Sequence, residues 1–332
     1  MAVQEVILET KPAGPVEYNE KAVLKVFEET GYVIADTKED GVQLNLTVKM
    51  VNAGEASGCG VSFLSRAGKI LPAIQRAYLD CPATMWFTKI LEDDCCIYPK
   101  GFMLQAEIVT PGFPAEITAG NLRRKSKALD LSTTEIHVFG VVPIETIESG
   151  ADHDVTHGVM KYHVEAITGL LQKHVPQITW KVCESVDVFT PEELQRIYGI
   201  RREQGKEGLV VKDPNAIWKR GKKVGQWKMK PEDTIDGKVI GLLWGTPGLA
   251  NEGKVIGFEV LLEDGHVVNA CGLTKEQMEE FTTSVHESSE GGAFPQMGWT
   301  VEVGFMERFK DGSLRHPSFS RWRGISEPTI KE

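Results

Sequence analysis

The sequence predicts an α+β protein with two domains, in which a larger domain of mixed strands and helices precedes a small β-barrel. The length of 332 residues fits one large domain or two ordinary ones. Strand and helix patterns are interspersed up to Pro231, and after it close-set strand patterns surround a single helix pattern. The second pattern is typical of a barrel of the oligonucleotide-binding type. We therefore expect domains at 1–231 and 232–332.

Composition excludes several classes of protein. Hydrophobic residues make up 41% and charged residues 25%, which are globular values and exclude a mainly disordered chain. There is no apolar run of 18 residues, so we expect no contact with a membrane interior. The first residues lack the basic-then-apolar pattern of a secretion signal, so the cytoplasm is the expected compartment. The six cysteines include no C-x-x-C pair and are interpreted as reduced thiols.

The net charge argues weakly against a nucleic-acid partner. Lys and Arg total 37 against 47 Asp and Glu, so 37 − 47 gives −10. Two local runs point the other way, NLRRKSK at 121–127 and KRGKK at 219–223. Because charges act over a Debye length of ~8 Å, such runs can bind phosphates on an acidic protein. A solvated loop is the alternative for each run taken alone.

In the first domain, hydrophobic periodicity defines the elements in order. Helix-like spacing predicts helices over 18–31, 70–79, 152–171 and 191–204. Alternation or β-branched runs predict strands over 32–35, 42–48, 60–65, 102–109, 136–144, 178–188, 208–211 and 226–229. Gly31 ends the first helix, and Thr190 with Glu193 forms a capping box before the last. Residues 111–130 are rich in turn formers and basic residues, which predicts a long loop.

In the second domain, strands joined by Gly and Asp turns surround one helix. We expect strands over 238–244, 255–262, 266–269 and 298–307, and a helix over 274–286. The domain boundary falls near Pro231.

One candidate nucleophile lies in the turn that follows the first predicted strand. Lys38 begins K-x-D-G, with Asp40 and Gly41 forming the turn. A lysine that is partly desolvated there has a lowered pKa and a nucleophilic amine. The motif is short, and a surface hairpin lysine is the more common explanation when it occurs alone.

Two further motifs predict a cationic pocket. Residues 206–214 read KEGLVVKDP, and residues 226–231 read QWKMKP. Lys228 and Lys230 point the same way because strand side chains alternate with period two. Converging lysines require an anion, and a polyphosphate suits them.

The ordered set of motifs resembles the ATP-dependent DNA ligases of the covalent nucleotidyltransferase superfamily. The set is K-x-D-G, Ser65-Arg66, Glu107 and Phe139 in strands, E-G-L-V-V-K and W-K-M-K. The small bacteriophage DNA ligases of the short-tailed coliphage group are most similar, and segments such as GLANEGKVIGFEVLL extend the resemblance over about 20–324. It implies a nucleotidyltransferase (ATP-grasp-like) domain of antiparallel sheets with helices, followed by an OB-fold domain.

The resemblance also implies roles for particular residues. Lys38 would attack the α-phosphate of ATP, form lysyl-AMP, and pass the AMP to the 5′-phosphate of a nick, which the 3′-hydroxyl then seals. The resemblance implies nucleotide contacts for Asp36, Thr37, Gln43, Arg66, Glu107, Phe139, Lys222, Lys228 and Lys230. Glu107 and Glu207 would bind Mg²⁺. Contacts to DNA or pyrophosphate are implied for Arg123, Arg124, Lys125, Arg315, Arg321 and Arg323.

Three departures from the family pattern predict slower self-adenylylation. Gln43 replaces the usual arginine that holds the ribose. Gln105 and Ala106 replace an acidic residue and a glycine before Glu107. Glu39 replaces an apolar or aromatic neighbour of the nucleophile, and a carboxylate there would raise the lysine pKa.

The expected partner is nicked double-stranded DNA, bound by a monomer, in the host-cell cytoplasm if the gene is carried by a phage. Two alternatives remain open at this point. One is another covalent nucleotidyltransferase, either an RNA ligase or a capping guanylyltransferase. The other is a relative that binds nicks without catalysis, which the departures at Gln43, Gln105 and Ala106 would favour. A comparison of ATP with GTP, and of nicked DNA with RNA, separates them.

Overall fold

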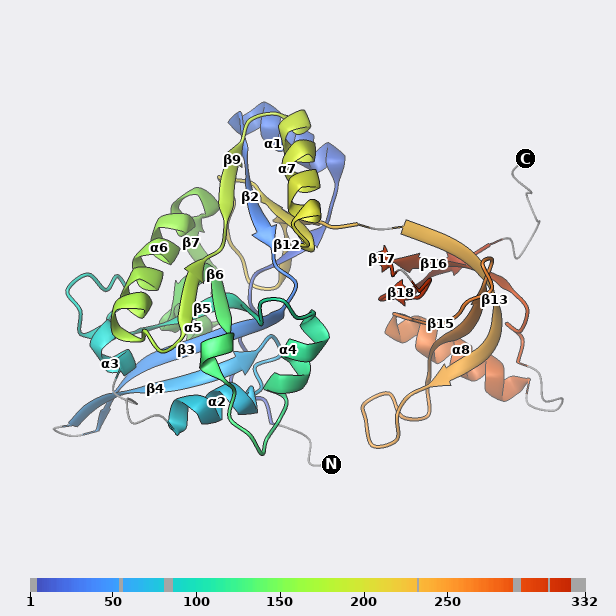
Figure 1. Ribbon diagram of the computed structural model, residues 1–332, viewed down its shortest axis with the longest axis horizontal. Coiled ribbons are helices and arrows are strands. Elements are labelled where there is room, and N and C mark those ends of the chain that lie inside the picture. The colour runs from blue at the N-terminus through green and yellow to red at the C-terminus, as the bar shows by residue number, and fades with distance from the viewer. Residues whose placement is uncertain are drawn as a thin grey trace. The chain divides into compact units, whose positions relative to one another are not determined.

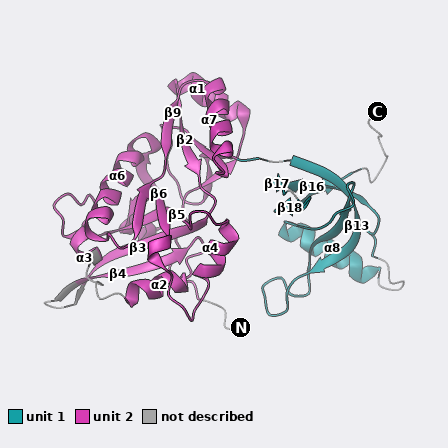
Figure 2. Ribbon diagram, viewed as in Figure 1, with its two compact units in different colours: residues 1, 230–332 teal, residues 2–229 magenta. Residues whose placement is uncertain are grey.

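The computed structural model describes residues 5–53, 56–80, 86–231, 233–288, 294–309 and 311–323. The chain divides into two compact units, residues 2–229 and residues 230–332 (Figure 2). The α+β class and the succession of a larger mixed unit and a small barrel agree with the sequence prediction.

The first unit contains two five-stranded sheets and seven labelled helices within its described residues (Figure 1). The helices are α1 (Glu20–Thr30), α2 (Pro72–Leu79), α3 (Trp86–Leu91), α4 (Ala115–Leu122), α5 (Ile144–Ser149), α6 (His157–His174) and α7 (Pro191–Glu203). The strands are β1 (Gly14–Glu17), β2 (Val33–Lys38), β3 (Val42–Ala53), β4 (Ala56–Ser65), β5 (Gly101–Val109), β6 (Glu135–Pro143), β7 (His153–Thr156), β8 (Thr179–Val182), β9 (Ser185–Val188), β10 (Gly208–Lys212), β11 (Ile217–Trp218) and β12 (Lys222–Met229).

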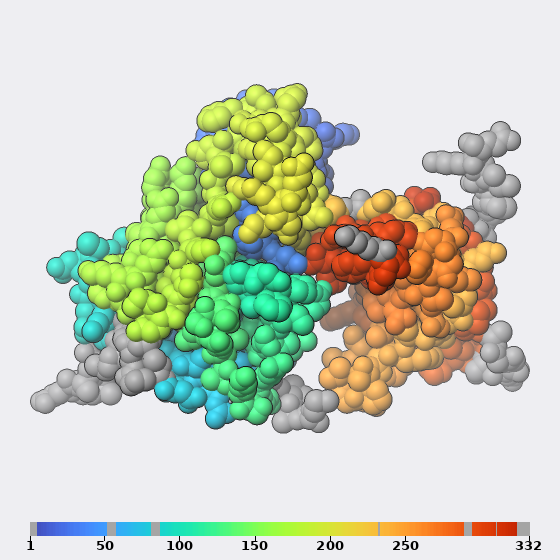
Figure 3. Space-filling view, viewed as in Figure 1, coloured from blue at the N-terminus to red at the C-terminus, as the bar shows by residue number. Residues whose placement is uncertain are grey.

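One sheet has the order β1-β12-β10-β2-β9 and the other β4-β3-β5-β6-β8. Most neighbouring strands are antiparallel, but β1 runs parallel to β12 and β6 runs parallel to β8. The apolar faces of α1 and α7 pack on β2, β10 and β12, while α2, α3 and α6 pack on the second sheet. Residues of α6 and α7, yellow-green in Figure 3, form much of the surface on the face shown there.

Several local signals explain the helix ends. Asn19 caps α1 through a 2.9 Å bond from the Ala22 amide, and Gly31 ends it in the left-handed conformation that glycine adopts without steric cost. Thr190 accepts from the Glu193 amide at the start of α7, and the Glu193 carboxylate accepts from the Phe189 amide. These ends agree with the prediction to within two residues.

Three predicted elements of the first unit differ from the structure. The predicted loop 111–130 contains α4, whose short length and weak amphipathicity hide it. The predicted strand 178–188 is two strands in different sheets, β8 and β9, because the chain changes direction at Cys183 and Glu184. The predicted helix 152–171 begins only at His157, because residues 153–156 form β7 and pair with β11.

The second unit is a closed barrel in the order β13-β14-β15-β19-β16. Its elements are β13 (Asp233–Trp244), β14 (Val255–Leu262), β15 (Val267–Cys271), α8 (Lys275–Glu287), β16 (Thr300–Phe305), β17 (Glu307–Arg308), β18 (Leu314–Arg315) and β19 (Ser318–Trp322). Thr274 and Gln277 form a reciprocal capping box at α8. The sequence prediction missed β19, which closes the barrel by pairing with β15 and β16.

Candidate active site

Strand β2 separates core residues from polar site residues by simple alternation. Val33 and Ala35 face the core under α1 and α7. Ile34, Asp36 and Lys38 point to the opposite face, since side chains alternate along a strand. One strand therefore anchors the core and presents a charged row.

Lys38 is the last residue of β2 and forms an ion pair with Glu207. The Glu207 amide also donates a 3.0 Å hydrogen bond to the Lys38 carbonyl, next to β10. The two side chains are 24% and 14% exposed, so the amine is partly desolvated but accessible. A lysine held by a carboxylate at the end of a strand is well placed to act as a nucleophile.

The turn after Lys38 requires glycine and brings a donor to Glu107. A Cβ at Gly41 would lie 2.3 Å from the Ile108 carbonyl oxygen, so no larger residue fits. The Gly41 amide hydrogen-bonds the Glu107 carboxylate. Burial raises the pKa of Glu107 to about 8, Lys38 opposes this rise, and the charges of Glu207 and Asp40 add to it. A bound cation would reduce the electrostatic repulsion among these carboxylates.

A cavity of about 470 Å³ lies beside β2 and is lined by Ile34, Asp36, Phe139, His157 and Lys212, among others. Lys212 pairs with Asp36 at 2.5 Å, and both are buried. Phe139 is partly exposed on β6 and offers an aromatic face to the cavity. The cavity therefore combines an aromatic side chain with a buried ion pair.

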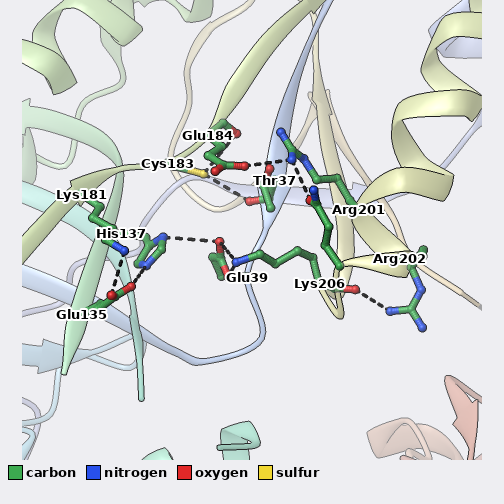
Figure 4. Close-up of polar contacts among 11 residues, drawn as sticks. Thr37, Glu39, Glu135, His137, Lys181, Cys183, Glu184, Arg201, Arg202 and Lys206 are labelled. Carbon is green, nitrogen blue, oxygen red and sulfur yellow. Dashed lines mark hydrogen bonds and ion pairs between the residues drawn. The ribbon is translucent and has the colours of Figure 1, made fainter. Parts of the chain in front are cut away.

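Thr37 contacts the segment between β8 and β9 through its backbone. Its amide donates to the Glu184 carbonyl at 2.7 Å, and its carbonyl accepts from the Cys183 thiol at 3.2 Å. Its hydroxyl is buried without a hydrogen-bond partner. The backbone of Thr37 thus joins β2 to the link between β8 and β9 (Figure 4), and the contact to adenine stays a prediction.

Glu39 is buried, and its carboxylate contacts Lys206 and His137 rather than Lys38. The Lys206 ammonium donates to both carboxylate oxygens at 2.8 Å, and Nδ1 of His137 lies 3.4 Å from one of them (Figure 4). The effect of Glu39 on self-adenylylation stays a prediction.

The other predicted phosphate-binding residues lie along β12 and its neighbours. Lys228 pairs with Glu17 on the adjacent β1 at 2.6 Å. Arg66 and Lys222 lie together beside Gly14, where an added Cβ would be 3.1 Å from the Arg66 guanidinium and 3.8 Å from Lys222. Lys230 directly follows β12.

Gln43 and Glu107 are opposite each other in the β3–β5 ladder. The Gln43 amide donates to Asn45 at 3.3 Å. Gln105 is buried and bridges the Ala13 carbonyl and the Trp218 indole, at 3.0 and 2.7 Å, so the departure at this position has a structural role.

The basic residues expected to contact DNA differ in their surroundings. Arg123, Arg124 and Lys125 are exposed directly after α4. In the barrel, Arg321 and Arg323 both bind the buried carboxylate of Glu302, and Arg323 also binds Asp236. Arg315 pairs with Glu307.

Sequence reasoning missed three residues that the structure brings to this region, which are His137, His157 and Lys206. Lys212 ends the motif E-G-L-V-V-K that predicts a cationic pocket, but the sequence assigns it no role of its own. The alternation in GLVVK could have indicated Lys212, which has the same side-chain orientation as Val210 and lies beside β2. No sequence signal links His137 to Glu39, because their pairing depends on how two separate sheets meet.

Comparison with known proteins identifies the family. The family model described as "ATP dependent DNA ligase domain" matches residues 16–230, and "DNA ligase C-terminal domain" matches 231–294. The chain belongs to the ATP-dependent DNA ligase family. The DNA ligase of Enterobacteria phage T3 is 40% identical over 351 residues, with 97% of this chain and 98% of the relative covered. The DNA ligase of Escherichia phage T7 is 39% identical over 360 residues, with 96% and 98% covered.

A solved structure agrees with this family assignment. The ATP-dependent DNA ligase of bacteriophage T7 in complex with ATP matches with a TM-score of 0.62 and 40% identity, covering 95% of this chain and 99% of that one. The predictions of a DNA ligase and of its fold are thus confirmed, and the RNA ligase and capping-enzyme alternatives are not supported. Within the described part of the chain, none of the helices has the length and hydropathy needed to cross a membrane.

Proposed function

We propose that this DNA ligase seals 5′-phosphate/3′-hydroxyl nicks in duplex DNA, with Lys38 as the residue that carries AMP. The observation that carries the proposal is the Lys38–Glu207 pair, which lies on the same strand face as Asp36 and the 470 Å³ cavity. A base stacked on Phe139 would direct its phosphates along this face toward Lys38.

The proposed reaction has three steps, which are two transfers of AMP and the formation of the phosphodiester bond. The Lys38 nitrogen forms a bond to the α-phosphorus of ATP, loses a proton, and displaces pyrophosphate. An oxygen of the 5′-phosphate at the nick then forms a bond to the phosphorus of the AMP, the phosphorus–nitrogen bond breaks, and the lysine nitrogen takes up a proton. The 3′-hydroxyl then attacks that 5′-phosphorus, loses its proton, and displaces AMP. Positioning and charge neutralisation dominate such chemistry, and Lys222, Lys228, Lys230 and Arg66 would supply the positive charge.

The carboxylates of Glu107 and Glu207 fit a Mg²⁺ ion. Mg²⁺ prefers oxygen ligands and is commonly held by one or two carboxylates together with phosphates. Burial and neighbouring carboxylates raise the pKa of Glu107, and a bound cation would lower it again. When bound, the ion would neutralise charge that develops on the transferred phosphate.

The partner and compartment are part of the same proposal. The exposed basic segment Arg123–Lys125 supports contact with a DNA backbone. The relatives from phages T3 and T7 support action in the cytoplasm of an infected host. We propose that the protein acts as a monomer, because one nick presents one site.

The test is incubation with α-labelled ATP and Mg²⁺, followed by a denaturing gel. Label should remain on the wild-type protein and be absent from Lys38→Ala. Lys49→Ala is a matched control, because Lys49 is another ion-paired lysine at a strand position away from this site. It should be labelled like the wild type.

Label on Lys38→Ala at the wild-type level would overturn the assignment of the nucleophile. If neither protein is labelled, pyrophosphate pre-treatment separates two cases. Recovery of labelling would show that the protein was purified already carrying AMP. No recovery would reject the proposed first step.

A further inference from the structure

Glu39 connects the two sheets of the first unit at the base of the candidate active site. It follows β2 of one sheet, and its carboxylate binds Lys206, which precedes β10 of the same sheet. The same carboxylate meets His137, which lies on β6 of the other sheet. Glu39 is 8% exposed and His137 is 7% exposed, so water screens this contact little.

The contacts continue on both sides (Figure 4). Nε2 of His137 lies 3.0 Å from Glu135, which in turn binds Lys181 on β8 at 2.8 Å. At the other end, the Arg202 guanidinium donates to the backbone carbonyl of Lys206 at 2.6 Å. Charges of alternating sign thus run from β8 to the start of β10.

The pKa values of the two central groups are consistent with a charged pair. Burial opposes both charges, but the bonds from His137 and Lys206 outweigh it and lower the pKa of Glu39. Burial is likewise outweighed at His137, where Glu39 and Glu135 raise the pKa. Removal of one partner would leave a buried charge without compensation.

Each of the three central residues is next to a residue of the proposed chemistry. Glu39 follows Lys38, and Lys206 precedes Glu207. His137 is opposite Glu107 in the β5–β6 ladder. We call the contacts of Glu39 with Lys206 and His137 the bridge. The bridge holds the backbone next to Lys38 and next to Glu207, and it connects this part of the chain to the sheet that carries Glu107 and Phe139.

We propose that Glu39 is a positioning residue for self-adenylylation, which holds the Lys38 amine in line with the sheet that carries Phe139. The proposal rests on the proposed function, in which Lys38 is the nucleophile. The bridge acts on the lysine step most strongly, because only that step needs the amine at a fixed place opposite the α-phosphate. Sealing of a nick that already carries AMP does not use the amine.

The experiment compares two reactions in the same protein. The first is single-turnover labelling by α-labelled ATP over a range of ATP concentrations, which separates the maximal rate from the ATP affinity. The second is sealing of pre-adenylylated nicked DNA without ATP. The variants are Glu39→Gln, Lys206→Gln, the double variant, and Glu29→Gln as a matched control on the exposed face of α1.

In Glu39→Gln we expect the maximal labelling rate to fall at least tenfold, with ATP affinity and pre-adenylylated sealing within twofold of wild type. Glu29→Gln should match the wild type in both reactions. The double variant should be no slower than the worse single variant, because both changes break one contact. The proposal would be overturned if Glu39→Gln were labelled at the wild-type rate, or if it lost labelling and sealing equally. It would also be overturned if the loss of labelling rate in the double variant equalled the product of the two single losses.

A second variant keeps the test decisive if Glu39→Gln does not fold. His137→Gln removes the contact to the second sheet and leaves the Lys206 bond to Glu39 in place. It should show the same separation of labelling from sealing, with a smaller loss. Loss of both reactions together in this variant would overturn the proposal. Labelling of Lys38→Ala would instead reject the proposed function on which the inference rests.

Discussion

His157 is a buried histidine without a carboxylate partner among the contacts of the described residues, and it begins α6 beside the cavity. Burial lowers its pKa to about 3, with a contribution from the charge of Lys212. Between this value and the ordinary value of 6.5, the unfolded chain binds a proton that the folded chain does not. Folding stability should therefore fall as pH falls below 6.5, by up to about 1.4 kcal/mol per pH unit.

The check is the free energy of unfolding of wild type and His157→Gln between pH 5 and 7.5. The wild-type value should decline more steeply below pH 6.5, and the two curves should be parallel above it. Other groups titrate equally in both proteins, so only the difference between the curves is interpreted. Parallel curves throughout would show that His157 titrates alike in the folded and the unfolded protein, so that burial does not lower its pKa.

Gln43 is the residue at which this chain departs most directly from the family pattern. It is opposite Glu107, and its neutral amide bonds to Asn45. In Gln43→Arg we expect tighter ATP binding, by about 1–3 kcal/mol, because a charged donor replaces a neutral one. The ATP dependence of labelling measures this, with Gln43→Leu as the control for shape. Equal ATP affinity in Gln43→Arg and the wild type would show that the residue at position 43 does not contact ATP.

At the scale of elements, the exposed segment after α4 is the candidate DNA contact. Arg123, Arg124 and Lys125 follow Leu122 directly, and the Arg76 guanidinium holds the Lys125 carbonyl at 3.1 Å. Each phosphate contact that is lost should reduce the slope of log binding constant against log salt by about 0.9. Replacement of all three by Gln should therefore flatten the slope for nicked DNA.

Binding titrations at several salt concentrations measure the slope. Lys25→Gln, on α1, is the control for a change of surface charge, and it should keep the wild-type slope. A triple variant with an unchanged slope would show that this segment does not touch the DNA backbone.

The elements that the sequence predicts well are those whose signal is local. The cap of α1 and the capping box of α8 mark their own ends, and the apolar run Val255–Leu262 is a strand in full. The sequence does not show where one strand leaves its sheet. Residues 178–188 look like one strand, but the partners of β8 and β9 are in different sheets.

The site follows the same division. Lys38, Glu207 and Glu107 were predictable from motifs, and the structure brings them together. The Glu39–His137 contact was not predictable, because it joins residues about a hundred positions apart that no pattern relates. Short motifs specify chemistry, but long-range packing decides which neighbours support it.

At the scale of the whole molecule, the two units have separate cores. In the second unit, Phe258 packs against Phe281 at 5.3 Å and against Trp322 at 5.1 Å, inside a closed barrel with its own helix. Because closure leaves no unpaired barrel edge, we expect residues 230–332 to fold without the rest of the chain.

Thermal unfolding of this fragment, followed by circular dichroism, should be cooperative. Phe258→Ala should abolish or strongly weaken the transition, since loss of a buried phenylalanine costs about 3–5 kcal/mol. A fragment that melts gradually, with or without this change, would show that the barrel depends on the first unit.

The alternation along β2 has a genetic consequence. Substitutions at Val33 or Ala35 remove core contacts and would lower the amount of protein in the cell. Substitution at Lys38, which is on the opposite face and partly exposed, would leave a folded protein that is catalytically inactive. Only alleles of the second kind can be dominant, because an inactive protein that still occupies nicks blocks the active copies. Recessive alleles should therefore fall at Val33 and Ala35 and dominant alleles at Lys38, within one short strand.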